Sequence, residues 1–209
     1  MTHYKNKLMA SLFSKRWLCI FVIILGVGWT DRLKAASELE RREARVQATY
    51  LTHLIEFTRW SESHLPKRGE SPTILVLGDE KNGFIASLEF LLAQSDLRIG
   101  GRKPRFIHLS GDQSNRFRTE MSKGCQVVFL MPGSTIKVQE VRKLSPSAVI
   151  FGFGRDFVTV RGGDVGFVSA RNRVKLILSD AYFRRTSPKL SAQIANLRSV
   201  VEIIRSSKP

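Results

Sequence analysis

The sequence predicts an α/β fold in which a mostly parallel sheet is flanked by helices and extended by a C-terminal β-hairpin. Short apolar runs, typical of buried strands, alternate with segments of helical period, as in β-α-β crossover units. After about residue 161 two short strands follow each other around a turn. Of the 209 residues 43% are hydrophobic, which is enough to build a normal core.

Residues 1–36 are predicted to be a signal peptide. Four basic residues, Lys5, Lys7, Lys15 and Arg16, precede fourteen uncharged residues, Trp17 to Thr30. A bilayer-spanning helix needs about 20 apolar residues, so the shorter run favours a secretory signal. The small residues Ala35 and Ala36 follow Leu33 and Lys34 and form a poor cleavage site, so an uncleaved anchor is the alternative. Residues 37–209 are then expected to form one α/β domain.

The first element of this domain is predicted to be an amphipathic helix with Ser37 as its N-cap. Its apolar residues recur at intervals of three and four: Val46, Tyr50, Leu51, Leu54, Ile55, Phe57 and Trp60. Tyr50, Phe57 and Trp60 are candidate anchors for a protein partner. The alternative is that these aromatic side chains pack into the core, since a buried stripe has the same spacing.

The remaining elements follow in order. The apolar runs predict four strands of the parallel sheet, at residues 73–77, 105–109, 125–131 and 148–153. Helical period predicts helices at residues 84–92 and 136–144, and the polar stretch 110–123 is a loop or a short helix. The hairpin strands are expected at residues 164–169 and 174–178, around a turn at 171–172, and a last helix is expected at residues 190–204.

The formal net charge of +16 calls for an anionic partner. Residues 1–36 hold six basic residues and one acidic residue, so the remaining chain keeps a charge of +11. Export separates the protein from nucleic acid, which excludes DNA or RNA as its partner. The basic surface is therefore expected to be solvated or to meet an anionic membrane surface, an envelope polymer or an acidic protein.

One loop has the position of a ligand site. The segment Gly78, Asp79 to Gly83 lies between a predicted strand and a helix, at the edge where α/β sheets bind ligands. It lacks the Lys-Ser/Thr pair of a phosphate-binding P-loop, so an ordinary turn is the alternative. Gly152 and Gly154 likewise lack the third glycine of a dinucleotide fingerprint.

No catalytic or metal-binding pattern stands out. His53, His64 and His108 lack the spacing of metal ligands, and Cys125 is embedded at the start of an apolar strand. A G-x-S-x-G nucleophile elbow is also missing. We therefore expect no enzyme activity, no metal and no cofactor, with a hydrolase of unfamiliar site design as the remaining enzymatic alternative.

Several segments together resemble the YfiR-like family of periplasmic regulators. The opening helix from Arg45 to Trp60 is similar to the helix that begins these proteins. The later segments occur in the order that the family shows: Ile74 to Asp79, Gly101-Arg102, Gly124-Cys125, Gly162 to Val168 and Leu190 to Ile194. Each motif alone is weak, but the ordered set is moderately specific and covers about residues 44 to 204.

The resemblance implies a periplasmic, dimeric signalling regulator. Such a protein binds the outer part of an inner-membrane diguanylate cyclase and restrains it, which lowers cyclic-di-GMP output and biofilm behaviour. The alternative function is an envelope binding protein for an anionic small molecule or glycan fragment. Some family members carry disulfides linked to redox control, and this mode cannot be transferred because Cys125 is the only cysteine after residue 36. The chain also has Leu176 to Ser179 and Ser187-Pro188 where the family has other residues.

Overall fold

The computed structural model describes residues 37–80, 82–111, 113–170 and 173–205. The predicted signal peptide and the predicted turn at residues 171–172 lie outside the described residues. The chain divides into two compact units, Met1–Glu40 and Arg41–Pro209. The second unit holds the sheet and the candidate sites.

The opening helix is described over residues 37–56. Five of its apolar side chains are buried in the core: Ala44, Ala48, Leu51, Leu54 and Ile55. The helix was predicted to continue to Trp60, and this extension is wrong: Thr58–Arg59 is the strand β1. β1 pairs antiparallel with β8 (Lys189–Leu190), and the Thr58 hydroxyl donates to the Leu54 carbonyl oxygen at 2.6 Å. Thr58 is β-branched and has a strand partner in β8, and both facts favour a strand here over another turn of helix.

Seven strands form the main sheet in the order β3-β2-β4-β5-β6-β7-β9. The strands are β2 (Thr73–Leu77), β3 (Arg105–Leu109), β4 (Val127–Leu130), β5 (Val149–Phe153), β6 (Val165–Ala170), β7 (Arg173–Ser179) and β9 (Val201–Ile204). The first five strands of this order are parallel, β7 runs antiparallel to β6, and β9 runs parallel to β7. The α/β fold with a mostly parallel sheet and an added hairpin is therefore confirmed.

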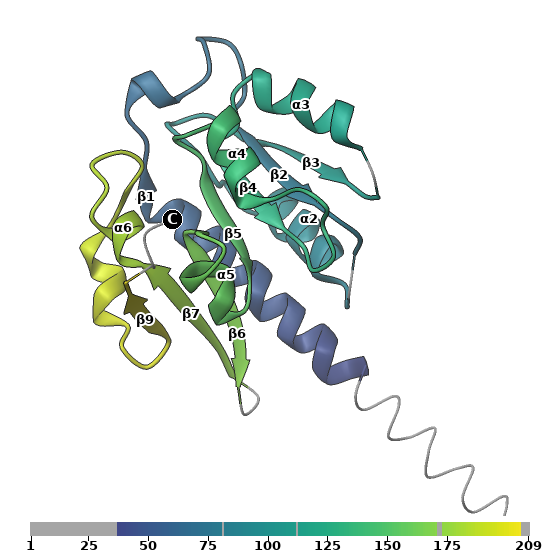
Figure 1. Ribbon diagram of the computed structural model, residues 1–209, viewed down its shortest axis with the longest axis vertical. Coiled ribbons are helices and arrows are strands. Elements are labelled where there is room, and N and C mark those ends of the chain that lie inside the picture. Colours follow the sequence, from purple (N-terminus) through teal and green to yellow (C-terminus); the bar gives the residue numbers. More distant parts are fainter. Residues whose placement is uncertain (1–36, 81, 112, 171–172, 206–209) are drawn as a thin grey trace, which may run out of the picture. The chain divides into compact units, whose positions relative to one another are not determined.

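Two layers of helices cover the two faces of the sheet (Figure 1). Ile74 and Val76 of β2 pack in one core with the opening helix and α2 (Phe84–Gln94). Leu75 and Leu77 point to the other face, because successive side chains of a strand alternate. That face packs against α3 (Ser114–Ser122), α4 (Val138–Leu144) and α5 (Arg155–Thr159). Burial on both faces explains why β2 is a continuous apolar run.

The parallel strands are doubly wound. β3 and β4 lie on opposite sides of β2, so the direction of winding reverses between β2 and β4. In open α/β sheets ligands commonly bind outside the carboxyl ends of the strands at such a reversal. Here Gly78 follows β2 and Met131 follows β4 at this point.

The prediction of a last helix at residues 190–204 is wrong. This segment forms β8, the 3-10 helix η2 (Ala192–Asn196) and β9. Its apolar spacing fits a helix, but Val200, Val201, Ile203 and Ile204 are β-branched and favour a strand. The open edge of β7 supplies the hydrogen-bond partners, as when the Leu176 N–H donates to the Val200 carbonyl oxygen at 2.8 Å.

The glycines near β5 have a packing role. A Cβ atom at Gly152 would lie 2.4 Å from the Phe157 ring, and one at Gly163 would lie 2.1 Å from it. Both distances are far below a normal contact, so only glycine lets Phe157 of α5 reach the sheet. The two glycines bring a helix close to the strand, which accounts for Gly152 without a bound dinucleotide.

Candidate functional site

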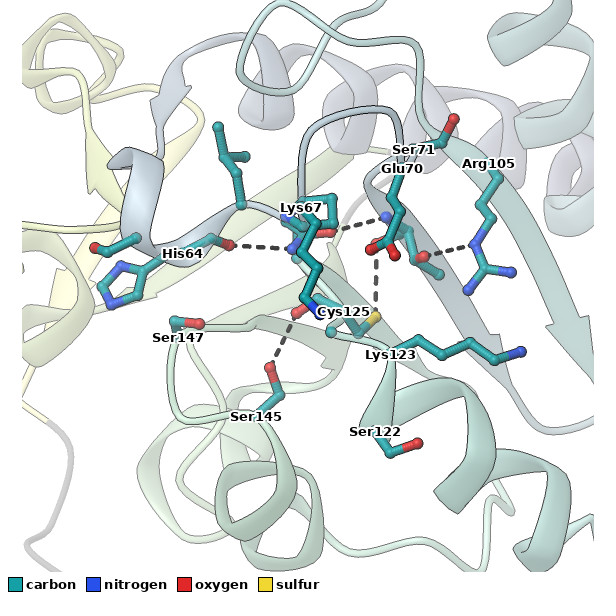
Figure 2. Close-up of a pocket in the computed structure, with 16 residues that line it drawn as sticks. His64, Lys67, Glu70, Ser71, Arg105, Ser122, Lys123, Cys125, Ser145 and Ser147 are labelled. Atoms are coloured by element: carbon teal, nitrogen blue, oxygen red, sulfur yellow. Dashed lines mark hydrogen bonds between the residues drawn. The ribbon is translucent and has the colours of Figure 1, made fainter.

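The candidate site is a polar cavity of about 750 Å³ at the amino-terminal edge of the parallel strands (Figure 2). We call it the amino-edge pocket. It lies beside Thr73 and Arg105, which begin β2 and β3, and beside Cys125 and Gln126, which precede β4. Residues of the 63–71 segment form another wall. Parallel strands all begin at one edge of the sheet, and this brings the starts of three strands together.

Gln126 ties the floor of the pocket to its wall. Its side-chain oxygen accepts a hydrogen bond from the Thr73 N–H at 2.8 Å, and its Nε2 donates to the His64 carbonyl oxygen at 3.1 Å. Gln126 is buried, and these bonds satisfy both ends of its amide. The segment before β2 is thereby fixed against the start of β4.

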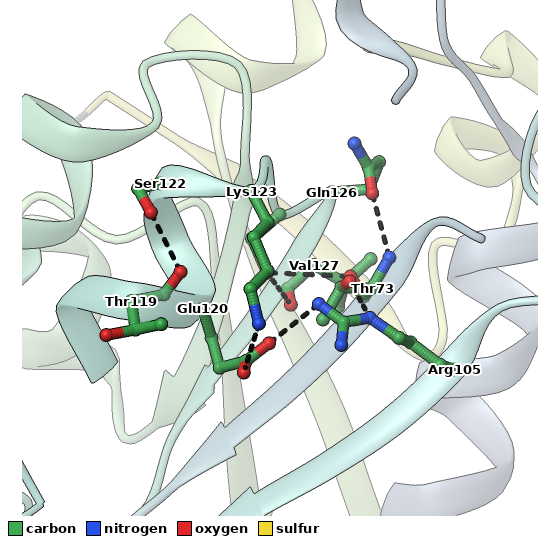
Figure 3. A network of polar contacts seen from close by, with 9 residues as sticks. Thr73, Arg105, Thr119, Glu120, Ser122, Lys123, Gln126 and Val127 are labelled. Carbon is green, nitrogen blue, oxygen red and sulfur yellow. Dashed lines mark hydrogen bonds and ion pairs between the residues drawn. The ribbon is translucent and has the colours of Figure 1, made fainter. Parts of the chain in front are cut away.

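A network around Glu120, next to the pocket, holds the lining residues Arg105 and Lys123 (Figure 3). The Glu120 carboxylate accepts hydrogen bonds from Arg105 Nη2 at 2.7 Å and from Lys123 Nζ at 3.0 Å. Arg105 Nε also donates to Thr73 Oγ1 at 2.9 Å. Burial raises the pKa of Glu120, but the hydrogen bonds and charges of Lys123 and Arg105 outweigh burial and hold the pKa below its ordinary value. The carboxylate is therefore charged at neutral pH and orients both cations.

Cys125 lies in the pocket floor as a buried, protonated thiol. Its Sγ lies 3.2 Å from the Val127 carbonyl oxygen and 3.5 Å from that of Thr73. Burial raises the pKa of the thiol to about 12. The thiolate is the nucleophilic form of cysteine, so this thiol is not activated for covalent chemistry. Cys125 is thus the small core residue that the sequence favours.

His64 does not assist the thiol. Its Nδ1 lies 2.9 Å from Ser187 Oγ and 3.2 Å from Ser61 Oγ. In Figure 2 the imidazole lies well apart from Cys125, with Lys67 between them. The residues around the pocket are arranged to bind and to position charge, and they do not form a nucleophile and base pair.

The sequence does not predict this pocket, because the ligand loop that it predicts lies at the opposite edge of the sheet. Arg105 is expected only to begin a strand, and residues 110–123 are expected to form a loop or a short helix. A usable signal existed in the register: Thr73 and Arg105 are the first residues of parallel neighbours, and they are Cα partners in the sheet. Polar residues that begin adjacent parallel strands are bound to meet.

The predicted ligand loop lies at the carboxyl end of β2, with little empty space beside it. Gly78 has φ of +110°, and a Cβ atom there would lie 2.9 Å from Met131 Cβ. Asp79 Oδ1 accepts a hydrogen bond from the Gly111 N–H at 3.1 Å, and Gly83 caps α2 with φ of +76°. The cavity next to Gly78 measures about 10 Å³, which is roughly the volume of one water molecule by this measure. A ligand role for Gly78, Asp79 and Gly83 stays a prediction.

The three aromatic candidates separate in space. Tyr50 and Trp60 are half-buried and pack against the core around the opening helix, and Trp60 Nε1 is buried without a hydrogen-bond partner among the described residues. Phe57 lies in the turn after the helix and is 38% exposed. Of these aromatic side chains, Phe57 is therefore the one most accessible to a partner.

No group of His, Cys, Asp and Glu able to hold a metal ion occurs in residues 37–205 as far as the structure describes them. Within the same described ranges, no helix is long and apolar enough to cross a membrane.

Fold and pocket together define a doubly wound α/β domain with a polar binding pocket at its amino edge. The sequence matches the YfiR/HmsC-like family over residues 44–198, and the chain belongs to that family. Members of the family are periplasmic regulators of diguanylate cyclases that act with a partner protein and are not catalytic. A search of curated proteins finds no match to this chain.

Proposed function

We propose that this protein binds the periplasmic part of an inner-membrane diguanylate cyclase and restrains it, so that cyclic-di-GMP output falls. The family match over residues 44–198 carries this proposal, because it spans the whole parallel sheet and both helical layers. The direction of the effect, restraint rather than activation, is part of the proposal.

The chemistry of the amino-edge pocket supports a binding role. Its thiol is protonated, and its cations Arg105 and Lys123 are held by the neighbouring carboxylate of Glu120. The reaction that makes cyclic-di-GMP then belongs to the partner enzyme, and this chain acts by contact.

Residues 1–36 are proposed to direct export and to be removed near Ser37. Lys5, Lys7, Lys15 and Arg16 before the apolar run support export. We further propose that the exported protein is a homodimer. Mass spectrometry of the protein from the periplasmic fraction checks the first proposal, and light scattering checks the second. A retained N-terminus indicates an uncleaved anchor instead, and a monomeric mass contradicts the dimer.

Phe57 is the proposed anchor for the cyclase on this chain. A partly exposed aromatic side chain next to well-packed core residues is typical of an energetic centre of an interface. We expect Phe57→Ala to weaken capture of the cyclase's periplasmic domain about tenfold, as for loss of an interface aromatic. Surface-immobilised full-length protein and the purified partner domain give the affinity.

Phe90→Ala is the matched control, because Phe90 lies on α2 and is 65% exposed. It removes the same ring from another surface and should leave the affinity unchanged. Urea unfolding should give both variants nearly the stability of the parent. Equal capture by Phe57→Ala and the parent would contradict the assignment of Phe57, and absence of capture by the parent would contradict the proposed function.

A further inference from the structure

A second cavity, of about 530 Å³, is lined by positive charge. Arg142 and Lys143 come from α4, Arg161 follows α5, and Arg185 follows α6 (Asp180–Phe183). Asp164, just before β6, is the one carboxylate among the described residues that line it. Four basic groups against one acidic group leave a formal excess of three positive charges. We call this cavity the arginine pocket.

Asp164 holds two of the arginines side by side. Its side chain is only 2% exposed, and its Oδ2 accepts a hydrogen bond from the Ile150 N–H at 2.8 Å. Oδ1 accepts from Arg185 Nη2 at 2.8 Å and forms an ion pair with Arg142. Arg142 Nη1 also donates to the Ala148 carbonyl oxygen at 2.8 Å. The two guanidinium groups are thus preorganised by backbone and carboxylate contacts, at the cost of mutual repulsion.

The positive charge of the pocket is under-compensated. Arg185 Nη1 is buried and has no hydrogen-bond partner in the described part of the chain. Burial lowers the pKa of Arg185, and the nearby charge of Arg142 lowers it further. The attraction of Asp164 raises this pKa but does not cancel the two effects. Lys143 is exposed at the rim and makes no ion pair among the described residues. A bound anion would relieve the repulsion between the basic groups that line the pocket.

We propose that the arginine pocket binds the phosphoryl group of a small phosphate ester. Guanidinium forks match phosphate oxygens in pairs, and a dianion suits an excess of three positive charges better than a single carboxylate does. A volume of about 530 Å³ lies within the usual range for small-molecule sites. A neighbouring hollow of about 280 Å³ shares Val138, Gln139 and Arg161, which gives space for the organic part of the ligand. This site is independent of the proposed cyclase contact.

Calorimetric titration of the full chain with inorganic phosphate and with glycerol phosphate at low salt tests the proposal. We expect binding that weakens as salt is added. The double variant Lys143→Gln, Arg161→Gln should bind about tenfold more weakly, as expected for losing hydrogen bonds to a charged ligand. Among the described residues, the ion pairs of Asp164 are with Arg142 and Arg185, so the double variant leaves this group intact and the fold should survive. Arg185→Lys keeps the charge and loses the fork, and it should also weaken binding.

The double variant Arg173→Gln, Lys175→Gln is the control, because both side chains are exposed on β7 outside the pocket and their replacement removes the same two positive charges. It should leave the affinity unchanged. Co-sedimentation with vesicles that contain phosphatidic acid, whose headgroup is a phosphate monoester, separates the two sources of a phosphoryl group. Pocket-dependent sedimentation assigns a lipid headgroup, and calorimetric binding without sedimentation assigns a soluble ester. Absence of binding to all these probes, or equal weakening by the β7 double variant and the pocket double variant, would overturn the proposal.

Discussion

At the scale of single residues, the buried carboxylates of the described part of the chain, Glu120 and Asp164, both have cationic partners. Asp164 is the most buried carboxylate that carries ion pairs, since its side chain is 2% exposed while those of Arg142 and Arg185 are 24% exposed. Removing one member of such a group leaves the remaining charges buried without compensation, which costs more than the group contributes when intact.

We therefore expect Asp164→Ala to lower the free energy of unfolding by about 3–5 kcal/mol, the range for breaking a buried ion pair. Urea unfolding followed by circular dichroism measures the change. The control is Asp96→Ala, which removes the pair between Arg98 and an 81% exposed carboxylate and should cost less than about 1 kcal/mol. Similar losses in the two variants would show that the Asp164 group is not a buried, coupled cluster.

The thiol of Cys125 is expected to be unreactive while the protein is folded. Burial raises its pKa to about 12, so almost no thiolate is present at pH 8. In a Cys19→Ser background, a disulfide reagent such as DTNB should label Cys125 only as fast as the protein unfolds, and urea should accelerate labelling. Rapid labelling of the native protein without urea would contradict the assignment of a buried, protonated thiol.

At the scale of elements, α3 is tied to the edge of the sheet by charge. Arg105 of β3 and Lys123 at the end of α3 both meet Glu120, whose side chain is 11% exposed. The pKa of Glu120 is lower in the folded protein, so its stabilisation is complete above the unfolded pKa. It disappears as the pH falls through the folded pKa.

We expect Glu120→Gln to lower the free energy of unfolding at pH 7 by about 1.5 kcal/mol, the low end for hydrogen bonds to charged groups, because both cations are partly exposed. The difference from the parent should shrink as the solution is made acidic. Glu140→Gln is the control, since Glu140 lies 3.9 Å from Arg118 in an exposed pair. A loss that is independent of pH would mean that packing, and not the charge of Glu120, is responsible.

The sequence predicted an element correctly where its local pattern and its tertiary context favour the same structure. The strand at residues 73–77 has the predicted bounds. A short continuous apolar run that contains β-branched residues is typical of a strand buried on both faces. Residues 201–204 became a strand because the edge of β7 was available, and no local pattern reports that edge. The amino-edge pocket was missed for the same reason: Thr73, Arg105 and Gln126 lie at the starts of three strands and meet only once the strand order is known.

At the scale of the whole molecule, the charge of +16 has several separable parts. Six of the basic residues lie in residues 1–36 and belong to the predicted signal. Part of the rest is neutralised in pairs such as Arg155–Glu202 and Arg184–Asp180. Arg142 and Arg185 share one carboxylate, so the arginine pocket keeps a local excess. The net charge alone does not say where on the protein an anionic partner would bind. The structure shows that part of the positive charge is gathered at the arginine pocket.

The central claim is that this member of the YfiR/HmsC-like family restrains a diguanylate cyclase from the periplasm. Cellular cyclic-di-GMP, measured by mass spectrometry in a strain without this gene, tests it most directly. We expect the level to rise on deletion and to return to normal with the full chain, but to stay raised with a chain that lacks residues 1–36 and remains in the cytoplasm. An unchanged cyclic-di-GMP level on deletion would contradict the account.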